Sequence, residues 1–207
     1  MSDSSVSDSS VRSGSRRRPR RSGPDRPSTP EDPALDQSVD PESAARTILL
    51  NKLTGQPRTR AELADTLAER GVPDEVAAKV LDRFGEVGLV DDAAFANAWV
   101  ESRHSGRGLA KRALAQELRH RGVDDELARD ALETLDSERE SATARALVRR
   151  KLGSMRSLDS QVAMRRLLGM LARKGYPAGL AMAVIREELD ASADELPVVD
   201  DAGFEPT

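Results

Sequence analysis

The stretch from Leu89 to Val123, LVDDAAFANAWVESRHSGRGLAKRALAQELRHRGV, carries the most informative pattern in the chain and its only tryptophan, Trp99. Asp91 is a suitable N-cap because its carboxylate can accept hydrogen bonds from the unpaired N–H groups of a first helical turn. Val90 and Phe95 have the spacing of a hydrophobic staple, and Phe95 and Trp99 lie four residues apart on one helical face. The first half of the stretch therefore predicts a helix, at 91–103.

The second half of the same stretch predicts another helix after a break at Ser105 and Gly106. Its apolar side would carry Leu109, Ala113, Leu114 and Leu118, and its other side Lys111, Arg112, Arg119 and His120. Two amphipathic helices around an aromatic anchor are a sufficient explanation of this stretch as far as the fold is concerned.

Three segments of the chain repeat one pattern: AELADTLAERGVPDEVAAKVL from Ala61, RALAQELRHRGVDDELARDAL from Arg112 and RRLLGMLARKGYPAGLAMAVI from Arg165. Each has a Leu four residues before a Gly, a basic residue directly before that Gly and an Ala six residues after it. The glycines are Gly71, Gly122 and Gly175. A cation in the last turn followed by Gly is typical of a helix end. The repetition predicts three repeats of three helices each.

The expected fold is all-α, with nine helices in three tandem three-helix repeats at 43–90, 91–136 and 137–189. In the first repeat, Thr59 and Glu62 match the capping box S/T-x-x-E at the start of a helix. The other helices with predicted bounds lie at about 124–135, 137–152 and 177–189. Residues 1–42, rich in Ser, Pro and Arg, and the acidic residues 190–207 are expected to be disordered tails, because such compositions bury too little apolar surface.

The composition argues against most catalytic chemistry. The chain has no Cys and two His, which excludes disulfides and thiolate zinc sites and disfavours a histidine-rich metal site. No catalytic sequence motif is found, and the acid pairs at 91–92 and 124–125 stand at predicted helix starts, where capping explains them. His104, at a helix end, is expected to be exposed, to cap the helix or to face a partner. We therefore expect no enzyme, no cofactor and no metal.

No apolar run approaches the roughly 20 residues that span a bilayer, and the N-terminus lacks a signal-peptide core. The sequence therefore predicts a cytoplasmic protein. The absence of heptads favours a monomer.

Basic residues are concentrated in the second and third repeats, although the net charge is −4. The segment from Arg139 to Lys174 contains ten basic residues and only two acidic ones, Glu140 and Asp159. The simpler interpretation is a solvated helical face, and the alternative is a surface that binds phosphates or an acidic protein. The candidate partner-binding residues are Arg103, Arg107, Lys111, Arg112, Arg119, Arg145, Arg149, Arg150, Lys151, Arg165, Arg166, Arg173 and Lys174.

Base-specific DNA recognition is not expected. The third helix of each repeat would enter the DNA groove, yet these helices begin with Pro-Asp-Glu, Asp-Asp-Glu and Pro-Ala-Gly, which are poor partners for a phosphate backbone. The basic stretches also contain almost no aromatic residues for stacking on single-stranded bases. Contact with phosphates or with a protein surface remains open.

From Val90 onward the sequence strongly resembles the RecX family, the bacterial regulatory proteins of the RecA recombinase. The resemblance covers about 43–189 and includes the RTILLNKLTGQPRTRAELADTLAERGV and LARKGYP segments. Ala178 and Gly179 depart from the usual polar or acidic residues at one helix start. The residues that carry the resemblance are Val90, Asp91, Asp92, Phe95, Ala96, Trp99, Val100, Arg103, Gly108, Leu114, Leu118, Arg121, Gly122 and Val123.

The resemblance implies nine helices in an elongated, curved array of three repeats. It also implies a protein that binds RecA, free or as a filament on DNA, and inhibits its ATP hydrolysis, strand exchange and co-protease activity. Such a protein would modulate recombination, DNA repair and the SOS response. The alternatives are a helical protein that binds DNA through its basic face without RecA, and a helical scaffold for another partner.

Overall fold

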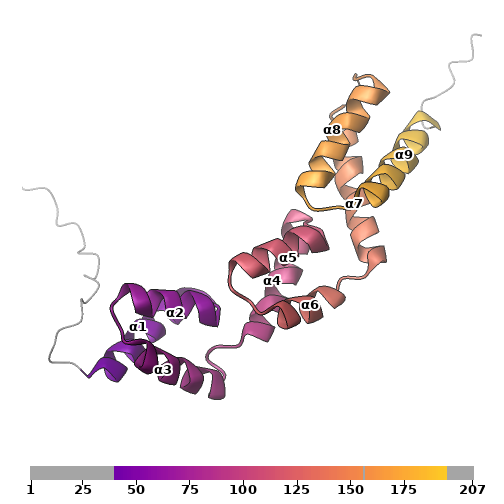
Figure 1. The fold of residues 1–207 in the computed structure, drawn as a ribbon. Coiled ribbons are helices and arrows are strands. Elements are labelled where there is room, and N and C mark those ends of the chain that lie inside the picture. Colours follow the sequence, from indigo (N-terminus) through magenta and orange to yellow (C-terminus); the bar gives the residue numbers. More distant parts are fainter. Residues whose placement is uncertain (1–39, 156, 195–207) are drawn as a thin grey trace, which may run out of the picture. The chain divides into compact units, whose positions relative to one another are not determined.

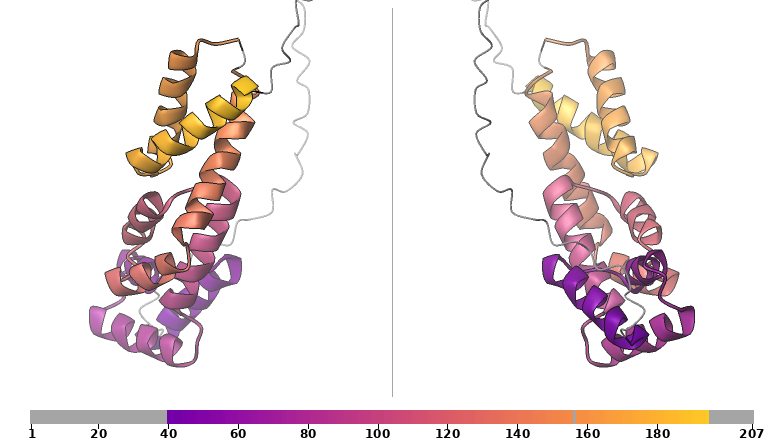
Figure 2. Two further views of the ribbon diagram at one scale, coloured as in Figure 1. Left: turned by 90° about the vertical axis from the view of Figure 1, so that its right-hand side faces the viewer. Right: turned by 90° about the vertical axis from the view of Figure 1, so that its left-hand side faces the viewer.

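The computed structural model describes residues 40–155 and 157–194, which form nine α-helices and no strand. Figure 1 shows the helices grouped in threes along the chain, and Figure 2 shows the same groups from two other sides. The predicted all-α fold of three three-helix repeats is confirmed. Most residues of the two predicted tails, 1–39 and 195–207, lie outside the described residues.

The first repeat consists of α1 (Pro41–Gly55), α2 (Arg60–Glu69) and α3 (Asp74–Glu86). Thr59 is the N-cap of α2, as predicted, and its side chain accepts a hydrogen bond from the backbone N–H of Glu62 over 3.1 Å. The apolar faces of the three helices form one buried cluster, in which Leu49, Leu63 and Leu67 are almost completely inaccessible.

The second repeat consists of α4 (Asp92–Arg107), α5 (Lys111–His120) and α6 (Asp125–Glu133). Asp91 caps α4 as predicted, because its carboxylate accepts the N–H of Ala94 over 2.8 Å. The predicted break at Ser105 and Gly106 is wrong, since α4 continues to Arg107. The helix ends at Gly108, which adopts the left-handed conformation with φ 62°.

The third repeat consists of α7 (Ser137–Leu152), α8 (Ser160–Arg173) and α9 (Ala178–Asp194). Helix α7 has the bounds that the sequence predicted. Helix α9 extends five residues beyond Leu189, where we expected the acidic tail to begin. The segment after Leu189 is free of helix breakers until Pro197, so acidic composition alone did not mark the end of the helix.

Each repeat has a core of its own, and most helix–helix packing occurs within a repeat. The cores are made mostly of Ala, Leu and Val at helical spacing. Neighbouring repeats are joined by a smaller set of specific contacts, which we call the joints.

The first joint connects the start of α2 to the second repeat. Thr59 is fully buried, and its hydroxyl donates a hydrogen bond to the carbonyl of Arg121, 2.7 Å away, at the end of α5. The N–H of Arg60, the first residue of α2, donates to the carboxylate of Asp92 over 2.8 Å. The first N–H groups of a helix have no partner within the helix, and here the next repeat supplies one.

The second joint connects the start of α5 to the third repeat in the same way. Ala110, the N-cap of α5, is fully buried in the core of the third repeat, and its N–H donates to the carbonyl of Lys174 over 2.9 Å. The N–H of Lys111 donates to the carboxylate of Glu140 over 2.8 Å. The hydroxyl of Tyr176 donates to the carbonyl of Gly108 over 3.2 Å.

The glycines of the repeated pattern make these joints possible. Gly122 and Gly175 have φ values of 72° and 88°, and a Cβ atom on Gly122 would lie 2.3 Å from the Cβ of Ala61. A Cβ on Gly175 would lie 2.6 Å from the backbone nitrogen of Ala113. Gly71, with φ 73°, has no described atom within 4 Å of its Cβ position. No described segment packs against Gly71, so among residues 40–155 and 157–194 its role is that of a helix terminator.

This difference predicts unequal effects of the same substitution. Gly71→Ala should cost about 1 kcal/mol of unfolding free energy, because an L-residue is strained in the left-handed conformation. Gly122→Ala and Gly175→Ala should each cost at least about 2 kcal/mol, because a steric clash at a joint adds to the same strain. Guanidinium unfolding followed by circular dichroism measures all three, and equal losses would contradict the steric role of the joint glycines.

The second joint also predicts an unusual tyrosine titration. Burial, and to a lesser extent the negative charge of Glu140, raises the pKa of Tyr176 above its ordinary value. Above the unfolded-state pKa of about 10, the folded chain then holds a proton that the unfolded chain has lost, so stability falls as pH rises. Tyr176 is the only Tyr, so absorbance at 295 nm reports it directly.

We expect no tyrosinate signal near pH 10 in the folded protein and a normal signal in guanidinium. The Tyr176→Phe variant should lose less stability between pH 9 and pH 11 than the parent chain does. A folded protein that titrates at the ordinary tyrosine pKa would contradict the burial of this hydroxyl.

Candidate partner-binding surface

Trp99 is the centre of a cluster of aromatic and guanidinium groups in the second repeat. Its ring stacks on Phe95, as predicted, with centroids 5.6 Å apart and planes inclined by 17°. The guanidinium carbons of Arg103 and Arg121 lie 4.0 Å and 3.8 Å from the centroid of the Trp99 ring. The indole N–H donates to the carboxylate of Glu117 over 2.9 Å. Helices α4 and α5 thus hold the ring from several directions.

Arg121 connects this cluster to the first repeat. Its guanidinium forms an ion pair with the Glu62 carboxylate at 2.5 Å, and both side chains are mostly buried. The Glu62 carboxylate therefore accepts from the second repeat and does not bond back to the N–H of Thr59. Of the two hydrogen bonds of the predicted capping box, only the one from the Glu62 N–H to the Thr59 hydroxyl is observed. The cation–π contact and the ion pair together fix the position of α5 relative to α2.

A groove of about 790 Å³ lies on one side of Trp99, and we call it the cationic groove. It receives side chains from α2, α4, α5 and α8. The carboxylates of Glu62 and Glu117 are already paired with arginines, at 2.5 Å and 3.6 Å. The lining residues are Glu62, Trp99, Arg103, Arg107, Leu109, Ala113, Gln116, Glu117, His120, Arg121 and Arg173.

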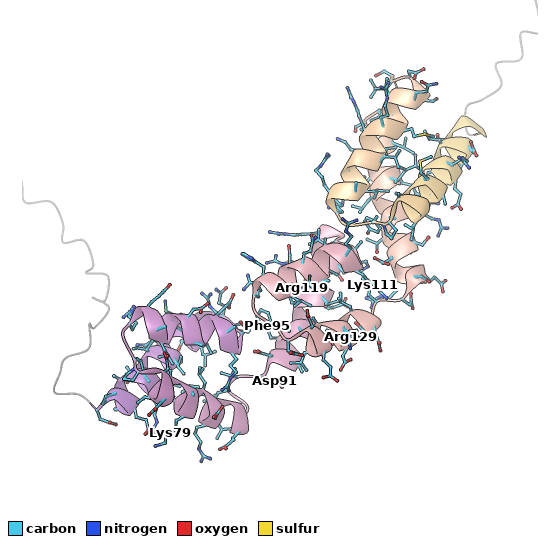
Figure 3. All side chains as sticks on the ribbon, in the orientation of Figure 1. Lys79, Asp91, Phe95, Lys111, Arg119 and Arg129 are labelled. Carbon is cyan, nitrogen blue, oxygen red and sulfur yellow. The ribbon has the colours of Figure 1, made fainter. Side chains whose placement is uncertain are left out.

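A second groove, of about 440 Å³, also has Trp99 in its wall, and we call it the apolar groove. It lies between the end of α1, the turn before α4 and the outer face of α4. Leu89 in this turn remains 50% exposed. The lining residues are Leu53, Gln56, Pro57, Arg58, Gly88, Leu89, Asp91, Ala94, Phe95, Ala98, Trp99 and Ser102. Figure 3 labels Asp91 and Phe95 at the beginning of α4.

A third groove, of about 370 Å³, lies between α5 and α6. Figure 3 labels three of the cations in its wall, Lys111, Arg119 and Arg129. The acids Asp125 and Glu133 line the same groove, and Asp125 pairs with Arg119 at 3.3 Å. Its cations are thus largely balanced by acids of the same groove.

Several of the candidate cations form contacts within the protein. Arg145 and Arg149 on α7 pair with Glu187 and Glu188 on α9, at 3.1 Å and 2.6 Å. The partner acids of these arginines therefore come from another helix and not from the next turn of α7. The Lys174 ammonium donates to the carbonyl of Arg107 across the second joint. Arg103 lies on Trp99, as described above.

The other candidate cations differ in their contacts. The backbone N–H of Lys111 belongs to the second joint, and the guanidinium of Arg165 donates to the carbonyl of Gln161 one turn earlier, over 3.4 Å. Six are exposed and have no ionic or hydrogen-bonded side-chain partner among residues 40–155 and 157–194. They are Arg107, Arg112, Arg150, Lys151, Arg166 and Arg173.

Some of these cations gather at the second joint. Burial lowers the pKa of Lys174, and the positive charges of Arg150 and Arg107 lower it further. The guanidinium of Arg107, from α4, thus lies in the field of cations from α7 and from the end of α8. A positive potential of this kind attracts carboxylates and phosphates.

His104 is buried, so two of the three roles expected for it, an exposed side chain and one that faces a partner, are wrong. Its side chain is buried in the second joint, and both ring nitrogens are hydrogen bonded. Nδ1 lies 2.9 Å from the carbonyl of Leu109 and donates to it, because a carbonyl can only accept. Nε2 lies 2.9 Å from the hydroxyl of Thr143 on α7. The residue connects the second repeat to the third.

Glu140 and Glu188 are the structural residues that sequence reasoning missed. Both are charged residues on the buried face of a helix. Glu140 lies one turn before the buried Ala144, and Glu188 lies one turn after the buried Ile185. A carboxylate on an apolar face was the available signal, since buried charges need partners.

Within the described part of the chain, no group of three or more His, Cys, Asp or Glu side chains is arranged to hold a metal ion. The described helices also include none that is long and apolar enough to cross a membrane.

Comparison with known families matches all three repeats in order. Residues 45–84, 91–132 and 138–185 match the models described as the first, second and third three-helix domains of RecX. The chain belongs to the RecX family. The matched domains coincide with the three repeats in the structure.

Relatives of the RecX family confirm the assignment. The chain is 56% identical to the regulatory protein RecX of Thermobifida fusca, over 84% of this chain and 95% of that protein. It is 54% identical to the RecX of Streptomyces lividans, over 80% and 88% of the two chains. These relatives are named regulatory proteins, and a regulatory role follows for this chain.

Two crystal structures of RecX proteins share the fold. The structure of RecX from Lactobacillus salivarius is 20% identical with a TM-score of 0.67, covering 72% of this chain and 97% of that one. A second regulatory protein RecX is 22% identical with a TM-score of 0.62, covering 73% and 72%.

The geometry around Trp99 predicts that two arginines at the C-terminal end of α5, Arg119 and Arg121, differ in their contribution to stability. Arg121→Gln should lower the free energy of unfolding by about 1–2 kcal/mol, because it removes a mostly buried ion pair and a cation–π contact. Arg119→Gln should change it by less than about 0.5 kcal/mol, because its pair with Asp125 is exposed. Thermal unfolding of both variants measures the difference, and similar losses would show that the Arg121 contacts contribute little.

Proposed function

We propose that this RecX-family chain binds RecA, as free protein and as the filament on DNA, and inhibits ATP hydrolysis, strand exchange and co-protease activity. It would act as a non-enzymatic regulator of recombination, DNA repair and the SOS response in the cytoplasm, and as a monomer. The observation that carries this proposal is the match of all three repeats to the three RecX domains in order.

The charge distribution supports the choice of partner. Six exposed cations of the second and third repeats have no side-chain partner among the described residues, so they are available to an external anion. A filament of protein and DNA offers both carboxylates and phosphates. Because a phosphate backbone alone would also attract these cations, a protein that binds DNA without RecA is the second candidate.

The experiment is a titration of the chain into RecA that hydrolyses ATP on single-stranded DNA. We expect inhibition at fewer than one chain per RecA, because a regulator of the filament affects many subunits per copy. No inhibition in molar excess, with RecA and DNA shown to be active, would contradict the proposal. Binding to free DNA tighter than micromolar with a steep salt dependence, without an effect on RecA, would establish the second candidate, and micromolar or weaker binding would exclude it.

Charge reversal should identify the surface. The double variant Arg150→Glu, Lys151→Glu should weaken inhibition at least tenfold without a change in the helical circular dichroism, since both side chains are exposed. Arg149 is left unchanged because it pairs with the buried Glu188. The matched control reverses Lys52 and Arg186, two exposed cations outside the candidate set. If the Arg150→Glu, Lys151→Glu variant inhibits RecA as strongly as the control variant and the parent chain do, the end of α7 lies outside the interface.

A further inference from the structure

The apolar groove has properties that the cationic surface does not explain. Its walls combine the partly exposed side chains of Leu53 and Leu89 with one edge of the Trp99 cluster. Exposed apolar side chains that line a concave surface commonly mark a binding site. Ala94 and Ala98 are exposed on the outer face of α4 and leave room above the helix for a larger apolar group.

The charges in this groove do not suit a nucleic acid strand. Its lining residues, all in the described part of the chain, include one cation, Arg58, and one carboxylate, Asp91. Arg58 already lies 3.7 Å from Glu62, and the Asp91 carboxylate caps α4. A phosphate chain would gain little there, whereas an aliphatic or aromatic side chain would leave water for an apolar surface.

The cationic groove begins at the same tryptophan. Trp99 lines both grooves, and Arg107 and Arg173 in the cationic groove are exposed without a side-chain partner among the described residues. Arg107 is nine residues beyond Ala98 on α4, which corresponds to about 13 Å along the helix. An extended segment crosses this length in about four residues, and a helical segment crosses it in between two and three turns.

We propose that the two grooves form one docking site for a segment of the protein partner that carries a large apolar side chain followed by carboxylates. The apolar side chain fills the apolar groove beside Trp99, and the carboxylates pair with Arg107 and Arg173. This inference rests on the proposed function, in which the protein partner is RecA. It assigns the direct protein contact to the face of the second repeat around Trp99, from the apolar groove beside the first repeat to Arg173 of the third.

The test fills the apolar groove with a side chain of the protein itself. Ala98→Trp places a large ring on the exposed face of α4, and Ala78→Trp, on the exposed face of α3 and outside the groove lining, is the matched control. Binding to RecA filaments on single-stranded DNA, and separately to the DNA alone, is measured by biolayer interferometry. Ala98→Trp should weaken filament binding at least tenfold because its ring occupies the apolar groove, and Ala78→Trp should change it less than twofold.

Two further variants keep the test conclusive if Ala98→Trp perturbs folding. Leu89→Asn removes an exposed apolar wall before α4 begins, and Arg107→Glu with Arg173→Glu reverses the charges of the cationic groove. Each should weaken filament binding at least tenfold and keep the circular dichroism of the parent chain. Reversal of Lys52 and Arg186 is the charge control.

The outcomes separate this inference from the proposed function. Normal filament binding by folded groove variants would contradict the docking site alone, because the parent chain would still bind and inhibit RecA. No binding by the parent chain would contradict the proposed function and the docking site together. Equal weakening of filament and free DNA binding by Ala98→Trp would identify nucleic acid as the occupant and overturn the inference.

Discussion

The hydrogen bond from the buried Thr59 hydroxyl to the carbonyl of Arg121 represents the constraint on which the arrangement of the repeats depends. A helix start that is covered by another part of the protein must find partners for its free N–H groups, because an unpaired buried donor costs about 1–3 kcal/mol. At the starts of α2 and α5, the following repeat supplies the acceptor for the first N–H group. Asp92 accepts the first N–H of α2, and Glu140 accepts that of α5.

The same joints create the surface that we assign to the partner. Arg121 lies at the C-terminal end of α5. Its carbonyl accepts the hydrogen bond of the Thr59 hydroxyl, and its guanidinium contacts the Glu62 carboxylate and the ring of Trp99. Trp99 consequently stands between the apolar groove and the cationic groove. A substitution that opens the first joint would therefore disturb partner binding without touching a contact residue.

The features that could be predicted from the sequence are those that the spacing of neighbouring residues determines. The repeated Leu and Gly positions gave the three repeats, and Asp91, Phe95 and Trp99 gave the start of α4 and its aromatic stack. Sequence reasoning could not predict that Asp92 caps a helix that begins 32 residues earlier, since such a bond depends on how the repeats meet. For the same reason the buried role of His104 and the pairing of Arg149 with Glu188 were missed.

We infer that the joints make the three repeats one cooperative unit, and the fluorescence of Trp99 tests this coupling directly. As the only Trp, it reports the first joint by fluorescence, while circular dichroism at 222 nm reports the helices of all repeats. We predict that the two signals follow a single guanidinium transition with the same midpoint. A fluorescence transition that is complete while a large part of the helical signal remains would show that the repeats unfold independently and that the joints do not couple them.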